Sequence, residues 1–354
     1  MVPGDRPGRE GGTRGTPGAE PGASAMSEGA LDRMRAEAAG RQPLSPPPPG
    51  GFPPPGREHG YYGQPILKPP VWTWEVPLYF FTGGTAGAAA VIAAGARVTG
   101  ADLRLERAAL AIAALLALAS PVLLILDLGR PERFLNMLRV LKLRSPMSVG
   151  AWVLALFTPA VLAALAARMA SGPPLLAVAG DLAEGAAALL GLVLATYTGV
   201  LLAATAIPVW NSHRTLLPPH FAASALGSAA ALLELTGFLT PATQTLGIVA
   251  AGFETAVGAV IELRHRREDR PLHHGRSGFM IRLGGVLAGP LALGLRVVAG
   301  DEETVRLLAA LAFLAGAVIT RYAWLAAGRQ SAVDPGALFA TQRRQGRTES
   351  SRGM

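Results

Sequence analysis

Residues 185–213 read GAAALLGLVLATYTGVLLAATAIPVWNSH, a run of 29 uncharged residues between Glu184 and Arg214. A helix needs about 20 predominantly apolar residues to cross the roughly 30 Å of hydrocarbon in a bilayer. The run is therefore long enough to span a membrane, and it indicates a membrane protein.

Similar runs follow one another from Trp72 onward. Charged residues bound uncharged stretches between positions 75 and 97, 107 and 127, 144 and 168, and 184 and 214, and further apolar spans lie near 216–239, 242–264, 277–299 and 304–327. The last two reach spanning length only if Arg282 and Arg321 are counted inside them. Backbone groups in lipid must be hydrogen-bonded within the protein. We therefore predict an all-α membrane protein with eight transmembrane helices.

The composition agrees with this fold class. Only 16% of the 354 residues are charged and half are hydrophobic, whereas about 25% of residues are charged in a typical soluble protein. The mean hydropathy is +0.35. The chain contains no cysteine, which excludes disulfides, thiolate zinc sites and cysteine-ligated iron–sulfur clusters within it.

Two segments flank the predicted membrane domain of residues 71–329. Residues 1–70 are rich in proline and glycine and cannot bury enough apolar surface to fold, so we expect a disordered tail. No apolar run follows its first arginines, which argues against a signal peptide, and Met26 or Met34 could equally initiate the chain. Residues 330–354 are expected to form a disordered basic tail.

The basic residues are distributed unevenly between the two membrane faces. Eight helices place both tails and loops 2–3, 4–5 and 6–7 on one side, which holds 24 of the 32 Lys and Arg residues; the other side holds 6, and 2 lie within helices. Basic loops remain in the cytoplasm during insertion. We therefore predict cytoplasmic termini in a cell inner membrane, and interpret the net charge of +8 as a sign of orientation, not of nucleic-acid binding.

Polar side chains gather at one end of the predicted helices. The beginnings of helices 1, 3 and 5 and the ends of helices 2 and 4 meet there. These segments carry six candidate ligand-binding residues: Glu75, Tyr79, Asp127, Arg130, Tyr197 and His220. Convergence of polar groups in an otherwise apolar bundle is typical of a ligand site.

Four motifs occupy these segments in order: WEVPLYFFTGG (74–84), DLGRPERF (127–134), SPMSVGAW (145–152) and YTGVLL (197–202). Together with the helix count they resemble the NrfD/PsrC family, the membrane subunits of polysulfide-reductase-type complexes. The resemblance extends over about residues 60–330.

The resemblance implies two four-helix bundles and a function in electron exchange between a quinone, menaquinone or ubiquinone, and a partner iron–sulfur subunit. A catalytic subunit, expected to be of the molybdopterin type, completes such complexes. The family's quinone pocket lies at the beginning of helix 1, the end of helix 2 and the tyrosine of helix 4. These positions correspond to Tyr79, Asp127 and Tyr197 here.

The residues themselves suit quinone chemistry. A tyrosine hydroxyl can donate a hydrogen bond to a carbonyl oxygen, and the carboxylate of Asp127 or Glu75 can accept a proton from a quinol. Of the six histidines, only His220 lies within an apolar span, so the two facing ligands of a bis-histidine haem are lacking. With neither haem nor cluster of its own, the chain requires a partner that brings the redox centres.

Further charges lie within the apolar spans at Glu234, Glu254, Glu262, Arg282 and Arg321, and should face the bundle interior. Glu254 and Glu262 are two turns apart on nearly one helix face. They indicate either a proton path or structural ion pairs, with Glu254 pairing to Arg282 or Arg321.

Partner docking is expected on loops 2–3 and 4–5, through Arg130, Arg133 and Trp210, because the partner's cluster must lie close to the quinone. Two other functions remain open: a passive membrane anchor without quinone chemistry, and a secondary transporter. No clear internal repeat of the kind common in transporters is found in the sequence.

Overall fold

A computed structural model describes residues 67–128, 132–170, 172–300 and 302–341. Within these ranges the regular structure is helical and contains no strand. The chain divides into two compact units, of which the second, residues 65–354, holds everything that follows. The predicted disordered tail lies almost entirely outside the described residues.

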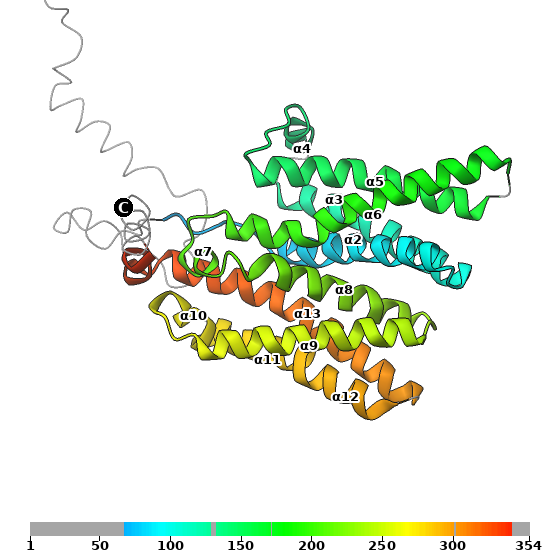
Figure 1. Cartoon of the computed structure of the whole chain (residues 1–354). Coiled ribbons are helices and arrows are strands. Elements are labelled where there is room, and N and C mark those ends of the chain that lie inside the picture. Colours follow the sequence, from blue (N-terminus) through cyan, green and yellow to red (C-terminus); the bar gives the residue numbers. More distant parts are fainter. Residues whose placement is uncertain (1–66, 129–131, 171, 301, 342–354) are drawn as a thin grey trace, which may run out of the picture. The chain divides into compact units, whose positions relative to one another are not determined.

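A first set of four long helices packs together in the N-terminal half of this unit (Figure 1). The helices are α2 (Glu75–Thr99), α3 (Leu103–Asp127), α5 (Pro146–Met169) and α6 (Pro174–Ala203), with a short α4 (Glu132–Met137) between α3 and α5. Small residues let helices of this set approach closely. A side chain at Gly87 of α2 would lie 2.4 Å from the carbonyl oxygen of Gly191 in α6, so these two backbones touch directly.

A second set follows. Its members are α8 (Leu217–Leu235), α9 (Pro241–Leu263), the span formed by α11 (Gly275–Val286), η2 (Leu287–Leu291) and α12 (Ala292–Ala299), and α13 (Glu303–Ala332). Short elements α7 (Pro208–Ser212), η1 (Arg267–Asp269) and α10 (Arg270–His273) join them. The third span is interrupted at Gly289, whose φ of −94° and ψ of −107° are not helical. Pro290 follows it and has no N–H to donate.

Seven helices in the described part of the chain are long and apolar enough to cross a membrane: α2, α3, α5, α6, α9, the α11–η2–α12 span and α13. The prediction of an all-helical membrane protein is confirmed to this extent. Helix α8 has only 19 residues and carries polar side chains such as Ser224 and Ser228. It packs against α2, α6, α9 and α13, so most of its surface faces protein rather than lipid.

Two helix ends differ from the sequence prediction. Within the 29-residue uncharged run, α6 ends at Ala203 and a separate helix, α7, follows. The sequence did not predict this helix end, because no charged residue in the run marks it. At the C-terminus, α13 continues to Ala332, so the boundary predicted at residue 329 falls inside a helix. Beyond it, Ala337 and Leu338 are buried.

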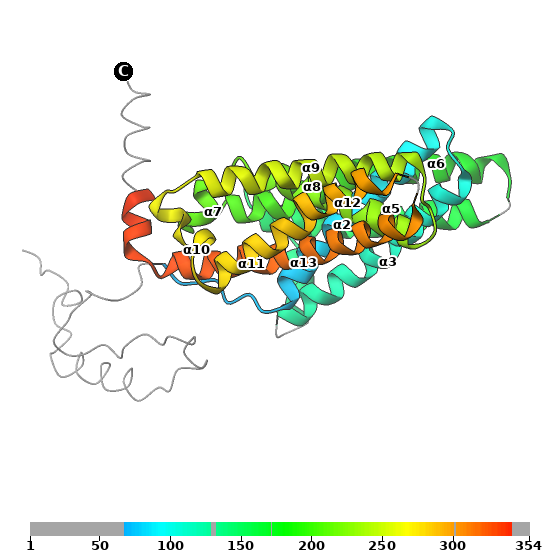
Figure 2. The ribbon, with the colours of Figure 1, turned by 90° about the horizontal axis from the view of Figure 1, so that it is seen from below.

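Short connections make successive helices antiparallel, and Figures 1 and 2 show α7 and α10 at the same end of the unit. We call this the α7/α10 end. Helices α2, α5, α8 and α11 begin there, whereas α3, α6, α9 and α13 end there. Five of the six candidate residues belong to the segments at this end, and the sixth, Arg130, lies outside the described residues.

The opposite end is closed by two buried ion clusters. In the first set, Arg168 at the end of α5 bonds Glu184 at 2.8 Å and also Glu106. In the second set, Arg296 at the end of α12 bonds Glu234 at 2.7 Å. Charge neutralisation inside the protein explains how helices with ionised ends can extend through the apolar region.

Candidate functional site

Tyr79, Asp127 and Tyr197 line one cavity of about 90 Å³ near the α7/α10 end. The beginnings of α2 and α5 and the ends of α3 and α6 form its walls, as the antiparallel topology requires. We call it the tyrosine cavity. Its other lining residues are Trp72, Val76, Phe80, Leu124, Leu128, Met137, Met147, Ala151 and Leu201.

Aromatic rings form one wall of the tyrosine cavity. Trp72 meets Phe80 edge to face, with ring centroids 6.1 Å apart, and stacks on Trp210 at 5.7 Å. Tyr79 and Phe80 are both buried, at 2% and 1% exposure. Trp72 and Phe80 were not among the residues predicted for the site, although Phe80 lies within the first motif and Trp72 lies just before it.

The second tyrosine depends on a glycine of the facing helix. The ring of Tyr197 in α6 lies where a side chain at Gly150 in α5 would stand, with Tyr197 Cζ only 1.9 Å from that Cβ position. Gly150 is part of the SPMSVGAW motif, but sequence alone gave no reason for a glycine there. The structure supplies one, because only glycine leaves room for the tyrosine ring.

Asp127 and Glu75 are linked through Thr73. The Asp127 Oδ1 atom accepts hydrogen bonds from the Thr73 backbone N–H at 3.0 Å and from its hydroxyl at 2.8 Å, and Glu75 lies in hydrogen-bond contact with the same hydroxyl. A hydroxyl has one proton to donate. The Thr73 hydroxyl can therefore donate to only one of the two carboxylates at a time.

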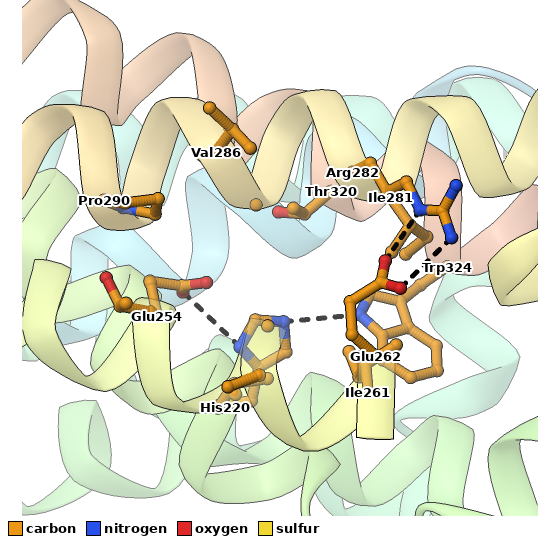
Figure 3. A pocket seen from close by; sticks show the side chains of 15 residues that line it. His220, Glu254, Ile261, Glu262, Ile281, Arg282, Val286, Pro290, Thr320 and Trp324 are labelled. Atoms are coloured by element: carbon orange, nitrogen blue, oxygen red, sulfur yellow. Dashed lines mark hydrogen bonds and ion pairs between the residues drawn. The ribbon is translucent and has the colours of Figure 1, made fainter. Parts of the chain in front are cut away.

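Two of the other three predicted site residues lie elsewhere. Glu75 is beside the tyrosine cavity but does not line it, and Arg130 lies outside the described residues. His220 lines a different and larger cavity of about 280 Å³, which we call the histidine cavity (Figure 3). Helix alternation predicted that His220 lies at the α7/α10 end, but the sequence does not show which set of helices encloses it.

The histidine cavity lies between α8, α9, the α11–η2–α12 span and α13. At its floor, Trp324 Nε1 donates to His220 Nε2 at 3.3 Å. The remaining nitrogen, Nδ1, therefore carries the proton in the neutral ring. It faces Glu254 Oε1 at 3.4 Å, as Figure 3 shows.

Among the described residues, Glu254 forms no direct ion pair with Arg282 or Arg321, although it interacts electrostatically with the charge of Arg321. Among the described residues, the ion pair of Arg282 is with Glu262, at 2.7 Å. Arg321 instead donates to the Phe221 carbonyl oxygen at 3.2 Å and lies over the Phe221 ring. The direct side-chain contact of Glu254 with a titratable group is the one with His220 Nδ1, at 3.4 Å.

Trp210 is not available for docking, contrary to the expectation from loop 4–5. Its side chain is fully buried, and its Nε1 donates to the Trp324 carbonyl oxygen at 2.9 Å. The tryptophan follows Pro208 in α7, which folds back against α13 instead of projecting outward. The Arg133 side chain lies outside the described part of the structure.

Loops 4–5 and 6–7 are joined by a buried group next to Trp210. His213 Nε2 bonds Asp269 at 2.9 Å, and Arg264 approaches His213 Nδ1 at 3.3 Å. Burial raises the pKa of Asp269, but hydrogen bonds from His213 and Ser212 and the charge of Arg264 outweigh it, so this pKa lies below its usual value. The group is structural, because it ties together two loops at the α7/α10 end.

In the part of the chain that the structure describes, no cluster of three or more His, Asp or Glu side chains could hold a metal ion. The comparison with curated proteins gave no match. A family model described as polysulphide reductase, NrfD, matches residues 66–332. The match covers all the long helices of both sets.

Proposed function

Because the chain belongs to the polysulphide reductase NrfD family, we propose that it is the quinone-binding membrane subunit of a multi-subunit oxidoreductase. The observation that carries this proposal is that Tyr79, Asp127 and Tyr197 line one apolar cavity from three different helices. The complex would include an iron–sulfur subunit and a catalytic subunit of the molybdopterin type.

The tyrosine cavity fits the head group in its chemistry. A quinol, when bound, supplies two electrons and two protons. The hydroxyls of Tyr79 and Tyr197 can donate to its oxygens, and Trp72 and Phe80 offer aromatic faces to its ring. The cavity is small, at about 90 Å³, but Met137 and Met147 line it. Methionine is unbranched and re-packs easily, so these walls can yield to a larger ring.

Asp127 would accept a proton and pass it outward. Its carboxylate lies at the cavity, and the Thr73 hydroxyl joins it to Glu75. In this proposal a proton accepted by Asp127 passes through the Thr73 hydroxyl to Glu75 and leaves at the α7/α10 end. This path from Asp127 to Glu75 supports proton release at the same end of the protein from which electrons leave.

We extend the proposal to the arrangement in the membrane. Helix α8 is an eighth span, shielded from lipid by its neighbours, and the two helix sets form the two four-helix bundles expected for the family. The charge asymmetry of 24 basic residues against 6 supports an α7/α10 end in the cytoplasm, with the chain in the inner membrane. A C-terminal alkaline phosphatase fusion should be inactive and a fluorescent-protein fusion bright; the reverse pattern contradicts this orientation.

A basic and apolar loop at the α7/α10 end supports partner docking there. Residues 139–144 read RVLKLR, and all six are exposed. The exposed fractions of Val140, Leu141 and Leu143 are 56%, 50% and 79%. Exposed apolar side chains between cationic ones are typical of an interaction surface. We assign this loop, in place of Trp210, to the contact with the iron–sulfur subunit.

A secondary transporter is the second candidate, because transporters commonly place interrupted helices at a central cavity. The break at Gly289–Pro290 beside the histidine cavity is of this kind. Purification from native membranes separates the candidates. A redox subunit contains bound iron and sulfide, and its co-purification supports the oxidoreductase, whereas a transporter purifies without one.

Photolabelling tests the quinone site. The complex in lipid nanodiscs is irradiated with an azidoquinone, and labelled peptides are identified by mass spectrometry. We expect label within residues 72–80, 124–128 or 197–201, competed by excess unlabelled quinone. Competed label that is absent from all three segments contradicts the site, and a passive anchor gives no competed label at all.

A further inference from the structure

The two cavities occupy corresponding places in the two helix sets. The tyrosine cavity is lined by the beginnings of the first and third spans of its set and by the ends of the second and fourth. The histidine cavity is likewise lined by all four spans of its set. The lining residues are His220 near the beginning of α8, Glu254 to Glu262 towards the end of α9, Ile281 to Pro290 in the third span, and Thr320 and Trp324 in the second half of α13.

An independent feature at the opposite end supports this correspondence. Each set has a buried arginine at the end of its third span, Arg168 in α5 and Arg296 in α12. Each arginine bonds a buried carboxylate of another helix in the same set, Glu184 and Glu234 respectively. The two sets therefore share a closed, ionic end and a cavity towards the α7/α10 end.

The floor of the histidine cavity has unsatisfied polar atoms. His220 and Glu254 are each only 2% exposed, and their Nδ1 and Oε1 atoms face each other at 3.4 Å without a hydrogen bond of suitable geometry to any group. Buried polar atoms without partners are costly, by about 1–3 kcal/mol each. A donor and a carboxyl group thus stand side by side at the bottom of a cavity, both able to bind a ligand.

The cavity opens to the lipid-facing side. Val286, on its rim, is 52% exposed, and Ala259 and Pro290 are also exposed. These apolar side chains line the cavity between α9 and the α11–η2 segment, and Figure 3 shows Val286 on the side of the cavity away from His220. A ligand would enter from the hydrocarbon phase, so it must be amphiphilic.

We infer that the histidine cavity is a second quinone-type binding site, which takes a flat neutral ring with oxygen substituents and an apolar tail. His220 would donate to one oxygen, and Glu254 would bond the same oxygen when that oxygen bears a proton. The volume of about 280 Å³ is near the lower limit of ordinary small-ligand pockets, about 300 Å³. The ligand class rests on the proposed function, whereas the site rests on the cavity and its unpaired polar floor.

A phospholipid fits this site less well than a neutral ring. An acyl chain alone would leave the floor atoms without partners. A phosphate group would be repelled by a carboxylate at Glu254, and the arginine that lines the cavity, Arg282, already bonds Glu262 through two N–H groups at 2.7 and 3.1 Å. The chemistry of the lining therefore favours a ligand without charge.

Glycines in the lining allow a clean test. A side chain at Gly258 in α9 or at Gly285 in α11 meets no atom within 4 Å, so phenylalanine at either position can project into the cavity without a backbone clash. Gly252, also in α9, has equally open space but does not line the cavity. Gly252→Phe is therefore the matched control.

The experiment counts bound quinone per chain by equilibrium titration with a radiolabelled quinone in nanodiscs of defined phosphatidylcholine. The wild-type chain, purified with whatever subunits accompany it, should bind two. Gly258→Phe and Gly285→Phe should each bind one, Gly252→Phe should bind two, and Tyr197→Phe should weaken only the other site. Thermal unfolding of each variant checks that it is folded.

Other outcomes distinguish the two proposals. One quinone in wild type that persists in both cavity-filling variants overturns the second site and leaves the proposed function intact. One quinone that is lost in those variants but retained in Tyr197→Phe supports the histidine cavity and contradicts the tyrosine cavity. If extraction with solvent recovers phospholipid from wild type but not from Gly258→Phe, with equal quinone in both, the occupant is lipid and the inference fails.

Discussion

Tyr197 fills the space that any side chain at Gly150 would occupy, with its Cζ atom 1.9 Å from the Cβ position of that residue. The contact joins α5 to α6 at the wall of the tyrosine cavity. It holds the tyrosine ring against a neighbouring backbone, so the direction of the hydroxyl is set by packing. The position of one proposed ligand-binding group thus depends on a residue that carries no functional group.

We predict that Gly150→Ala destabilises the protein by about 1–3 kcal/mol, the usual cost of overpacking a buried site, and lowers quinone affinity. The added methyl group must push the Tyr197 ring away from α5. Thermal unfolding in detergent and quinone titration measure the two effects. Gly185→Ala is the control, because Gly185 is exposed on α6 and its Cβ would meet nothing within 4 Å. Equal stability of the two variants would contradict the contact.

The buried ion cluster of the first set should be far more sensitive than an exposed ion pair. Arg168→Met leaves Glu106 and Glu184 buried without their cation, and we expect a loss of about 3–5 kcal/mol. Arg282→Met breaks a pair whose two side chains are 53% and 45% exposed, and should cost less than about 1 kcal/mol. Chemical unfolding of both variants compares them directly. Similar losses would show that Arg168 does not neutralise the cluster.

Much of this architecture follows from simple patterns. Long apolar runs, some of them with one or two charged residues inside, predicted the seven long apolar helices, because crossing a bilayer demands length and low polarity whatever the packing. Helix alternation then placed Tyr79, Asp127 and Tyr197 at one end, and these three line one cavity. Helix α8 is the exception among the predicted spans. Its surroundings are protein, so its composition need not be that of a lipid-facing helix.

The rest depends on packing, which has no pattern in the sequence. His220 stands at the expected end, yet side-chain contacts with Trp324 place it in the second cavity. Trp210 lies in a loop region, where exposure is the usual expectation, but its ring packs on Gly328 and is buried. The partner of Glu254 was likewise decided by the positions of neighbouring helices.

Acid should weaken the joint between loops 4–5 and 6–7. The pKa of Asp269 is lower in the folded protein than its usual value, mainly through hydrogen bonds that overcome burial. The ionised carboxylate therefore contributes stability that is complete above the unfolded-state pKa of about 3.9 and is lost as the pH falls through the folded-state value. We expect Asp269→Asn to be less stable than wild type at pH 7, by about 1–3 kcal/mol.

The pH dependence distinguishes this role from a merely steric one. The difference in unfolding free energy between wild type and Asp269→Asn should stay constant from pH 7 to about pH 5 and shrink below about pH 4. Unfolding measured in buffers across this range checks it. A difference that does not change with pH would mean that the charge of Asp269 contributes nothing.

Charge reversal in the exposed loop should release the partner subunit. We predict that Lys142→Glu together with Arg144→Glu reduces co-purification of the iron–sulfur subunit at least several-fold, because both side chains are exposed at the α7/α10 end. Arg104→Glu with Arg107→Glu is the matched control, since these arginines are exposed at the opposite end. Loss of the partner only in the control variant would place the docking surface at the opposite end and contradict docking on residues 139–144.

Quinone affinity of single-hydroxyl variants tests the central claim most directly. Tyr197→Phe removes one donor from the tyrosine cavity, and Tyr322→Phe makes the same change outside it, where the hydroxyl donates to the Trp74 carbonyl oxygen. We predict that Tyr197→Phe weakens quinone binding in the tyrosine cavity by about 1–3 kcal/mol, roughly 5- to 150-fold, and that Tyr322→Phe leaves it within twofold of wild type. Unchanged affinity in Tyr197→Phe, together with unchanged affinity in Asp127→Asn, would contradict quinone binding in this cavity.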